Sequence, residues 1–469
     1  MIKFLLPVFI YLLFLVSFAY FFVMAFYFLL LSAITFFEEK RRVMELDAED
    51  FTTLYSSSFT LPVSVIIPAH NEEEWITDSV KAALNLKYPE FEVIVVDDGS
   101  TDNTLKQLDS LLKLKPFDMP FAEYLRCGRI REIFKSQAYP NVTVISKDGG
   151  CKKAGAVNAA LNISRFKYVC VIDADTIVEP DALIKVMAHA QKDPENIIGI
   201  GAYFGLVNGL KIKDGQITKW SFSHNPIVAS QNIEYMRSLV VMRTAWSKFN
   251  VMPIIAGGFG IWRRDIFFEL GGYSPEYSSE DLEFTFRVHD YFLEKNDKKY
   301  KVLMLPYIAS WTEGPSNIAS FIRQRNRWQR VTNETVWHYK HMIFNLRYRT
   351  FGFFVLPYFL FYEVSGVFIE VASIAFLVWG ITVQVVDIRV FLAFFSFMVL
   401  TNTISSLLAI FIFTRDQKVF SMKNIIYFIV LSFLEFFWYK WIATIAKILG
   451  TLGWSKGIKT YDQYVRAAR

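Results

Sequence analysis

The chain is poor in cysteine and histidine, with three and six among its 469 residues. Cys127, Cys151 and Cys170 form no Cys-x-x-Cys pair and have no histidine at metal-site spacing, which argues against a zinc site. The histidines form neither a His-x-x-x-His pattern nor a triad-like arrangement. We therefore expect reduced, mostly buried thiols, as in a protein domain of the cytosol.

Charged residues are absent from the segment Phe4–Phe37. As a helix this segment would be roughly 50 Å long, against a hydrocarbon core of roughly 30 Å in a bilayer. The apolar core of a cleaved signal peptide is shorter, and no clear small-x-small cleavage site follows here. The sequence predicts a single long or tilted membrane anchor within residues 1–42.

The net charge of +5 is small, so it suits a protein at a membrane surface and gives no reason to expect a nucleic acid partner. Only Lys3 precedes the anchor, whereas Lys40, Arg41 and Arg42 follow it. The positive-inside rule then places the N-terminus outside and residues 38–345 in the cytosol. We expect a multi-pass protein of the plasma (inner) membrane.

Apolar segments return at Phe351–Val386, Phe391–Thr414 and Ile425–Leu449. The first two are expected to cross the membrane out and back, which places the loop Arg415–Lys418 in the cytosol. The last either spans, which leaves the basic tail outside, or lies in the plane or re-enters, which keeps the tail inside.

Three acidic residues interrupt these segments, namely Glu363, Glu370 and Glu435. Acidic side chains at membrane depth commonly face a polar cavity, so all three could line a passage. Alternatively, Glu363 and Glu370 lie in an interfacial stretch before the true span.

The middle of the chain alternates between strand and helix patterns. Apolar runs at Val63–Pro68, Phe91–Val96, Asn141–Ser146 and Tyr168–Ile172 predict four buried strands. An acidic-started helix is expected from Glu72 to about Leu86. This alternation predicts an α/β domain at residues 43–300, with a mostly parallel sheet and ligands beyond the carboxyl ends of its strands. The stretch Leu105–Tyr139 is expected to be a helical insertion that packs or lies on anionic lipid.

Polar clusters follow these strands. Asp173-Ala174-Asp175 places two carboxylates one residue apart, which can hold a hard divalent cation whose shell is completed by phosphate oxygens. Asp97 and Asp98 follow another strand, although Gly99 also makes them plausible turn residues. The Gly-rich basic loop from Gly149 leads into a helix, where Lys153 could approach a diphosphate.

Three later motifs follow, and two of them also have a purely structural interpretation. Gly257-Gly258-Phe259-Gly260 suggests a tightly packed turn near a bound ligand. Ser278 and Asp281 have capping-box spacing, so Asp281 could serve only as a helix cap. The basic aromatic helix with Gln324-Arg325-Asn326-Arg327-Trp328 could be only an interfacial anchor.

Taken in order, these motifs resemble those of the membrane-integrated family 2 (GT-A fold) glycosyltransferases, which include synthases of cellulose, hyaluronan, chitin-like backbones and poly-N-acetylglucosamine. The resemblance runs from Val63 to Trp328. It implies an α/β GT-A domain with a Rossmann-like mixed sheet and an α-helical transmembrane region. Residues 301–350 would then form interfacial helices, and residues 351–469 the C-terminal transmembrane or interfacial helices and tail.

The resemblance also implies roles for individual residues. Asp281 would be the general base, with Glu280 beside it in the catalytic group. Asp175 and Asp173 would bind Mg²⁺ or Mn²⁺. Contacts with the nucleotide sugar or the acceptor are implied for Pro68, Asn71, Glu72, Asp97, Asp98, Lys153, Asp173, Gln324, Arg327 and Trp328.

The implied activity is inverting transfer from a UDP-sugar to a growing β-linked polysaccharide, which is then secreted across the bilayer. A polysaccharide or lipid-linked acceptor, and an oligomer or accessory subunits, would be its partners. The alternatives are transfer of a single sugar to a lipid-linked or glycolipid acceptor, and a non-catalytic transporter or scaffold. No cyclic-di-GMP-binding domain follows the spans, so a cellulose synthase under that control is less expected.

Overall fold

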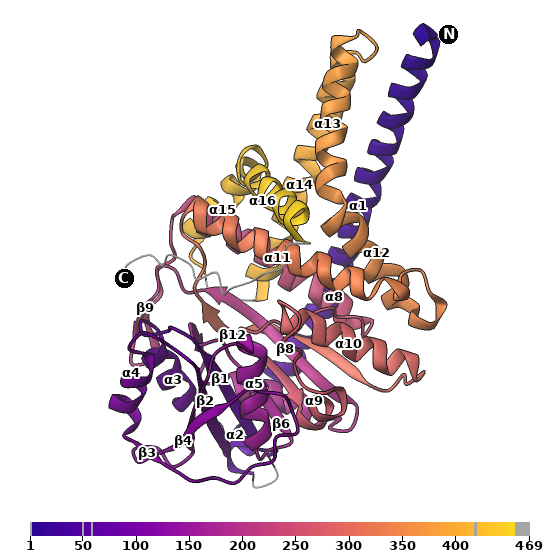
Figure 1. The fold of residues 1–469 in the computed structure, drawn as a ribbon. Helices are drawn as coiled ribbons and strands as arrows, with labels where there is room; N and C mark the ends of the chain where they lie inside the picture. The colour runs from indigo at the N-terminus through magenta and orange to yellow at the C-terminus, as the bar shows by residue number, and fades with distance from the viewer. Residues whose placement is uncertain (1, 49–50, 58–59, 417–419, 455–469) are drawn as a thin grey trace. The chain divides into compact units, whose positions relative to one another are not determined.

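The computed structural model describes residues 2–48, 51–57, 60–416 and 420–454 (Figure 1). The chain divides into two compact units. The helical unit comprises Met1–Glu38, His224–Ala245 and Pro315–Arg469, and the sheet unit comprises Glu39–Ser223 and Trp246–Gly314.

The sheet unit is built on one ten-stranded sheet in the order β3-β4-β5-β2-β1-β6-β11-β8-β12-β7. Its strands are β1 (Val63–Ala69), β2 (Phe91–Asp98), β3 (Leu114–Pro116), β4 (Ile130–Ser136), β5 (Val142–Lys147), β6 (Tyr168–Val171), β7 (Thr176–Val178), β8 (Ile197–Leu206), β11 (Gly260–Arg263) and β12 (Lys301–Thr312). A separate antiparallel hairpin pairs β9 (Lys211–Lys213) with β10 (Gln216–Lys219).

The four predicted strands form the parallel centre of this sheet, because β5, β2, β1 and β6 pair parallel in that order. Every residue of β1 is buried, as expected for a strand covered on both faces. Antiparallel pairs flank the centre, with β4 on β5 and β11 on β6. The Rossmann-like mixed sheet is confirmed, and its parallel part is limited to the centre and the β8–β12 pair.

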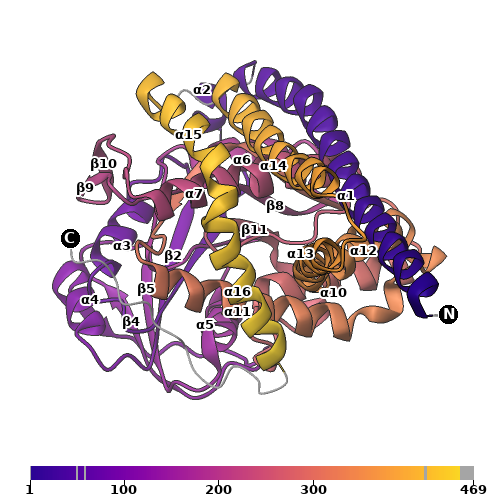
Figure 2. The same cartoon turned by 90° about the horizontal axis from the view of Figure 1, so that it is seen from above.

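The helices of the sheet unit include α5 (Figure 1), which packs on β1, β2 and β5. They also include α6 (Figure 2), which packs on β8 and β12. These helices are α2 (Phe51–Ser56), α3 (Ile76–Leu84), α4 (Thr104–Leu112), α5 (Lys152–Ile163), α6 (Ala182–Ala190), α9 (Arg264–Leu270) and α10 (Glu280–Glu294), while α8 (Arg243–Lys248) runs across the unit boundary. The helix expected from Glu72 begins only at Ile76. The backbone N–H of Glu72 donates to Thr104 Oγ1 at 2.8 Å, and residues 73–75 form turns before the helix begins.

The helical insertion expected at Leu105–Tyr139 is wrong beyond α4. The chain instead forms the strands β3 and β4, which extend one side of the sheet by antiparallel pairing. Ile133 is buried and pairs with Ile145 of β5. This pairing with a strand later in the chain satisfies the backbone and outweighs the local helix signals.

The helical unit contains the long helix α1, Ile2–Asp47, which is uninterrupted and continues past the unit boundary. Its other elements are α7 (Pro226–Tyr235), the π-helix η1 (Met236–Met242), α11 (Ile318–His338), η2 (Lys340–Met342), η3 (Leu346–Tyr348), η4 (Phe351–Val355), α12 (Leu356–Tyr358), η5 (Phe359–Val364), α13 (Gly366–Thr382), α14 (Ile388–Asp416), α15 (Met422–Leu434), η6 (Glu435–Phe437) and α16 (Tyr439–Gly453). Ile10 of α1, Leu377 of α13 and Phe394 of α14 share one apolar core. Figure 2 shows α1 running alongside α14.

Two described helices, Val8–Glu45 and Ile388–Arg415, are long and apolar enough to cross a membrane. Two bent pairs bring the number to as many as four if each pair is one span. They are Phe351–Val364 with Gly366–Thr382, bent by 51°, and Met422–Phe437 with Tyr439–Gly453, bent by 50°. All the expected hydrophobic segments are therefore helical. The basic tail with Lys456 and Lys459, and Lys418 of the expected cytosolic loop, lie outside the described residues.

The three acidic residues of the apolar segments are each paired with a base. Glu363 Oε2 lies 2.8 Å from Lys447 Nζ, and Glu370 Oε1 lies 3.1 Å from Lys440 Nζ. Glu435 pairs with Arg237 and also accepts a hydrogen bond from Ser406 Oγ at 2.7 Å. These pairs compensate charges that would be costly in an apolar environment.

Candidate active site

The parallel strands bring the predicted polar residues to one edge of the sheet. Asp97 and Asp98 are the last residues of β2, and Asp98 lies opposite Lys147, the last residue of β5. Asp173 follows two residues after the end of β6. Because β5, β2, β1 and β6 are neighbours, these side chains lie at adjacent strand ends.

Lys153 in the first turn of α5 gathers carboxylates from two other motifs. Its Nζ lies 2.5 Å from Asp173 Oδ1 and 2.8 Å from Glu280 Oε1. Burial opposes the charge of Lys153, but Asp173, Glu280 and Asp281 outweigh it and raise the pKa of Lys153 well above its usual value. Burial also disfavours the charged form of Glu280 and raises its pKa, although the Lys153 ammonium acts to lower it. The structure thus places Lys153, Asp173, Glu280 and Asp281 in one cluster.

Asp281 lies in the first turn of α10 with both carboxylate oxygens engaged. Oδ1 accepts hydrogen bonds from Ser279 Oγ at 2.5 Å and from the N–H of Leu282 at 2.8 Å. Oδ2 accepts from the N–H of Gly257 at 3.1 Å. Asp281 therefore satisfies one backbone donor of the helix start, yet its side chain remains half-buried beside the Lys153 cluster. The N-cap of α10 is Ser279, which makes no side-chain cap hydrogen bond, so the helix cap and the proposed base are different residues.

Gly257 packs against this cluster, as the sequence suggested for its turn. A Cβ atom at this position would lie 2.3 Å from Lys153 Nζ and 3.3 Å from Asp173 Oδ1. A side chain at position 257 would therefore have to displace the end of Lys153 from its contact with Asp173.

Asp175 is half-buried, and its Oδ1 accepts hydrogen bonds at 3.3 Å from Thr176 Oγ1 and from Thr312 Oγ1. Asp173 and Asp175 together offer hard oxygen donors from one loop, which fits Mg²⁺ or Mn²⁺ bound through one or two carboxylates plus phosphate. Within the described residues, no group of three or more His, Cys, Asp or Glu side chains forms a metal cage. The donor set suits a cation that arrives with a phosphorylated ligand.

Asp97 and Asp98 are buried and bonded within the protein. Asp98 pairs with the buried Lys147, whose Nζ also donates to the carbonyl of Asp148 at 2.7 Å. Burial raises the pKa of Asp98, although Lys147 opposes the rise. Asp97 Oδ1 accepts from the N–H of Ser100 at 3.2 Å, which is the turn contact that the sequence left open. Their nucleotide contacts stay a prediction.

The loop after β1 is joined to the loop after β2. Pro68 is buried within β1, and Asn71 follows in a left-handed conformation with φ 56°. The N–H of Thr101 donates to Asn71 Oδ1 at 2.7 Å. With the Glu72 bond to Thr104, these contacts fix the two loops as one rim at the carboxyl ends of the strands.

Gln324, Arg327 and Trp328 lie on α11 in the helical unit, spaced so that they share one helix face. Gln324 is buried, and its Oε1 has no hydrogen-bond partner among the described residues. The guanidinium of Arg325 lies 4.3 Å from the centre of the Trp328 ring and 3.0 Å from Glu234 Oε2. The neighbouring arginine thus fixes the Trp328 ring.

Sequence reasoning missed Lys147, Thr312 and the N–H of Gly257. Lys147 directly follows the predicted strand Asn141–Ser146, just as the aspartates follow theirs, so its position at a strand end was a usable signal. The contacts of Thr312 and Gly257 join distant parts of the chain and leave no local pattern.

A mixed sheet with carboxylates and a lysine clustered beyond its parallel strands is the architecture of a GT-A glycosyltransferase. The model of the family described as "Glycosyl transferase family 2" matches residues 64–270, and that of "Glycosyl transferase family group 2" matches residues 168–440. The chain belongs to the family 2 glycosyltransferases.

Relatives with assigned names cover much of the chain. A poly-beta-1,6-N-acetyl-D-glucosamine synthase of Staphylococcus epidermidis is 23% identical over 397 residues, which is 82% of each chain. The probable glycosyltransferase YdaM of Bacillus subtilis is 29% identical over 310 residues, 64% of this chain and 63% of its own. The protein is thus an enzyme related to polysaccharide synthases.

Among solved structures, the mannosyltransferase PcManGT of Pyrobaculum calidifontis, in complex with GDP-Man and Mn²⁺, superposes with a TM-score of 0.52 at 16% identity. It covers 89% of this chain and 99% of its own. At this identity the likeness shows the shared fold.

Proposed function

We propose that this glycosyltransferase is a processive, inverting synthase that transfers sugar from a UDP-sugar to a growing β-linked polysaccharide and secretes the product. The observation that carries the proposal is the cluster of Lys153, Asp173, Glu280 and Asp281, which combines a carboxylate able to act as a base with an ammonium able to face a diphosphate. Similarity to a named polysaccharide synthase over 82% of the chain supports the polymer product.

In the proposed reaction, Asp281 removes the proton from the acceptor hydroxyl while that oxygen attacks the anomeric carbon. Attack on the face opposite the leaving diphosphate converts an α-linked donor into a β-glycoside. The hydrogen bonds from Ser279, Leu282 and Gly257 hold the carboxylate in a fixed orientation for this transfer. Glu280 belongs to the same group because it positions Lys153.

The leaving diphosphate needs positive charge as it departs. Lys153 supplies one positive charge, because its ammonium would leave one of its carboxylate partners and pair with a phosphate oxygen. Mg²⁺ or Mn²⁺, held by Asp173 and Asp175, would supply further electrostatic stabilisation when bound. The joined loops with Pro68, Asn71 and Glu72, together with Asp97 and Asp98, would position the uridine.

Gln324, Arg327 and Trp328 would close over the diphosphate and the acceptor end, with the Trp328 ring stacked on a sugar. The helical unit would carry the product through the plasma (inner) membrane as a multi-pass region. We propose boundaries near residues 42, 314 and 350 for the anchor, the cytosolic catalytic domain and the interfacial helices. The boundary expected at residue 300 is wrong, because β12 (Lys301–Thr312) pairs with β8 inside the sheet unit.

Replacement of Asp281 by Asn tests this assignment, because it keeps the size and removes the base. Purified protein with Mg²⁺ or Mn²⁺ should release UDP from one member of a donor panel (UDP-glucose, UDP-N-acetylglucosamine, UDP-glucuronate and UDP-galactose) and build a long polymer. D281N should bind UDP but lose transfer by at least about 100-fold. Glu294→Gln, at the exposed far end of the same helix, is the control and should retain full activity.

Wild-type transfer rates in D281N would refute the role of Asp281. Product length separates processive synthesis from transfer of a single sugar to a lipid-linked acceptor. One sugar per acceptor over a full time course would favour the second activity, and no UDP release from any donor would favour a non-catalytic protein.

A further inference from the structure

A cavity of about 150 Å³ lies within the sheet unit, away from the candidate active site. Glu92 and Thr143, which line it, are the second residues of β2 and β5, whereas the candidate site follows the last residues of these strands. Six residues separate Glu92 from Asp98, or roughly 20 Å along a strand. The cavity therefore belongs to the opposite edge of the sheet.

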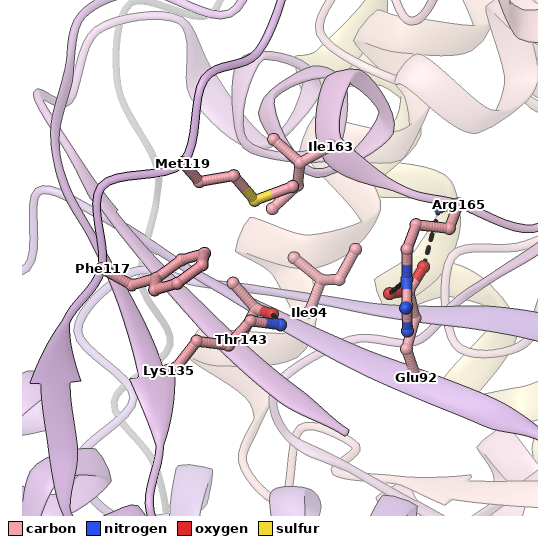
Figure 3. Close-up of a pocket in the computed structure, with 8 residues that line it drawn as sticks. All are labelled: Glu92, Ile94, Phe117, Met119, Lys135, Thr143, Ile163 and Arg165. Carbon is pink, nitrogen blue, oxygen red and sulfur yellow. Dashed lines mark hydrogen bonds and ion pairs between the residues drawn. The ribbon is translucent and has the colours of Figure 1, made fainter. Parts of the chain in front are cut away.

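One part of the cavity wall is apolar. Ile94 of β2 and Ile163 at the end of α5 are buried there, and Phe117 and Met119 come from the segment after β3 (Figure 3). A space of about 150 Å³ is large enough for a benzene-sized molecule, and it opens to solvent beside Phe117, which is 47% exposed. The space thus suits a small flat apolar group.

The charged part of the wall carries an excess of positive charge. Glu92 is buried and its oxygens are occupied, since Oε1 accepts from Ser64 Oγ at 2.7 Å and from the N–H of Arg165 at 2.8 Å, and Oε2 accepts from Arg165 Nε at 2.9 Å. Figure 3 shows this contact of Glu92 and Arg165 beside the cavity. One carboxylate therefore faces two cations, Arg165 and Lys135.

Lys135 is the cation left without an anion. Its Nζ donates to Thr143 Oγ1 at 2.7 Å, and among the described residues it forms no ion pair. Burial lowers the pKa of Lys135 and the nearby Arg165 lowers it further, and the charge of Glu92 offsets these effects only in part. A half-buried ammonium beside an apolar cavity would be stabilised by a negative group placed inside it.

We propose that this cavity binds a small organic anion, with its carboxylate or phosphate between Lys135 and Arg165 and a flat apolar body between Ile94, Phe117, Met119 and Ile163. The site is independent of the proposed function because it shares no residue with the candidate active site. A carboxylate and a phosphate share this chemistry, so the test includes both.

Ligand-observed NMR with the full-length protein in detergent tests the proposal with benzoate and phenyl phosphate as probes. At least one should bind, and neutral benzyl alcohol should bind at least about tenfold more weakly, because a charge-assisted hydrogen bond is lost. Lys135→Gln should weaken binding of the anion at least about tenfold. Lys106→Gln, which removes the same charge from exposed α4, should leave it unchanged.

Met119→Trp fills the apolar part without a change of charge and should abolish binding, provided that the variant melts at the wild-type temperature. Absence of binding by both anions would overturn the proposal. Equal binding of benzyl alcohol, or unchanged binding by K135Q and M119W, would overturn it as well.

Discussion

Two neighbouring glycines in the sheet unit differ in the space around them. A methyl group on Gly257 would meet Lys153 Nζ at 2.3 Å, whereas on Gly258 it would meet only ring carbons of Phe204 at 3.9 Å. Gly257→Ala should therefore displace the flexible end of Lys153 from Asp173 while the backbone stays in place. We expect transfer to fall by at least about tenfold, the scale on which lost electrostatic stabilisation acts.

Gly258→Ala is the matched control for this prediction, since it adds the same methyl group one residue away. Steady-state UDP release and thermal unfolding of both variants would check it. If G257A and G258A release UDP at equal rates, the contact of Gly257 with Lys153 has no role in transfer.

The burial of His289 in α10 should make the stability of the fold depend on pH. It is fully buried, with Nε2 2.8 Å from the carbonyl of Met252 and Nδ1 2.8 Å from Tyr300 Oη, and burial lowers its pKa to about 4. The folded state favours the neutral ring, so His289 contributes to the free energy of unfolding. This stabilisation is complete above the unfolded pKa of roughly 6.5 and is lost as the pH falls toward 4, for a total of about 3 kcal/mol.

Unfolding by denaturant between pH 7.5 and 4 would measure this effect in the wild type and in His289→Gln. The variant should be less stable at pH 7.5 but should lose about 3 kcal/mol less over the range. The exposed His341→Gln should follow the wild-type curve. Parallel curves for the wild type and H289Q would contradict the prediction.

At the scale of elements, the strand ends of the candidate site were predictable and its cross-contacts were not. The runs around Val65 and Val95 are apolar enough to mark buried strands, and parallel order then collects their carboxyl ends. Nothing local indicates that Lys153 reaches Glu280, which lies more than a hundred residues later. The same limit explains the error at β4, whose structure depends on pairing with β5.

The ion pairs of the helical unit make a second prediction at this scale. Glu363 and Lys447 join η5 to α16, and both side chains are only 25% exposed. Removal of either partner, by Glu363→Gln or Lys447→Met, should cost about 2 kcal/mol because it leaves a poorly solvated charge. The double variant should cost less than the sum of the two single variants.

Thermal unfolding in detergent, arranged as a double-mutant cycle, would measure the coupling between these residues. The pair Asp387 and Arg389 is a suitable comparison, because its side chains are 45% and 87% exposed at a similar distance of 2.8 Å. Its loss should cost less than about 1 kcal/mol. Strictly additive costs for Glu363 and Lys447 would exclude a stabilising pair.

For the whole molecule, the distribution of basic residues predicts which segments face the cytosol. The turn before α14 should lie outside, and α4 of the sheet unit should lie in the cytosol. An impermeant maleimide should therefore label Ile388→Cys, at the exposed first residue of α14 next to this turn, in intact cells. Lys106→Cys should react only after lysis. The native Cys127 and Cys170 are buried, and Cys151 belongs to the compartment of Lys106, so none should add label to intact cells.

Labelling of K106C in intact cells would reverse the proposed orientation. The sequence predicts this orientation from charge alone, but it could not predict which acidic residue meets which base. Those pairings depend on how α13, α14 and α16 pack, and on the bends that divide two of the apolar segments.

The charge pairs also bear on how the chain is made. Lys440 and Lys447 lie on α16, near the end of the chain, while their partners Glu370 and Glu363 are translated about seventy to eighty residues earlier. When α13 has been synthesised, Glu363 and Glu370 are therefore present, but the lysines that pair with them have not yet been translated. We expect α16 to pack onto η5 and α13 after both have been synthesised, so that the two ion pairs form late in the assembly of the helical unit.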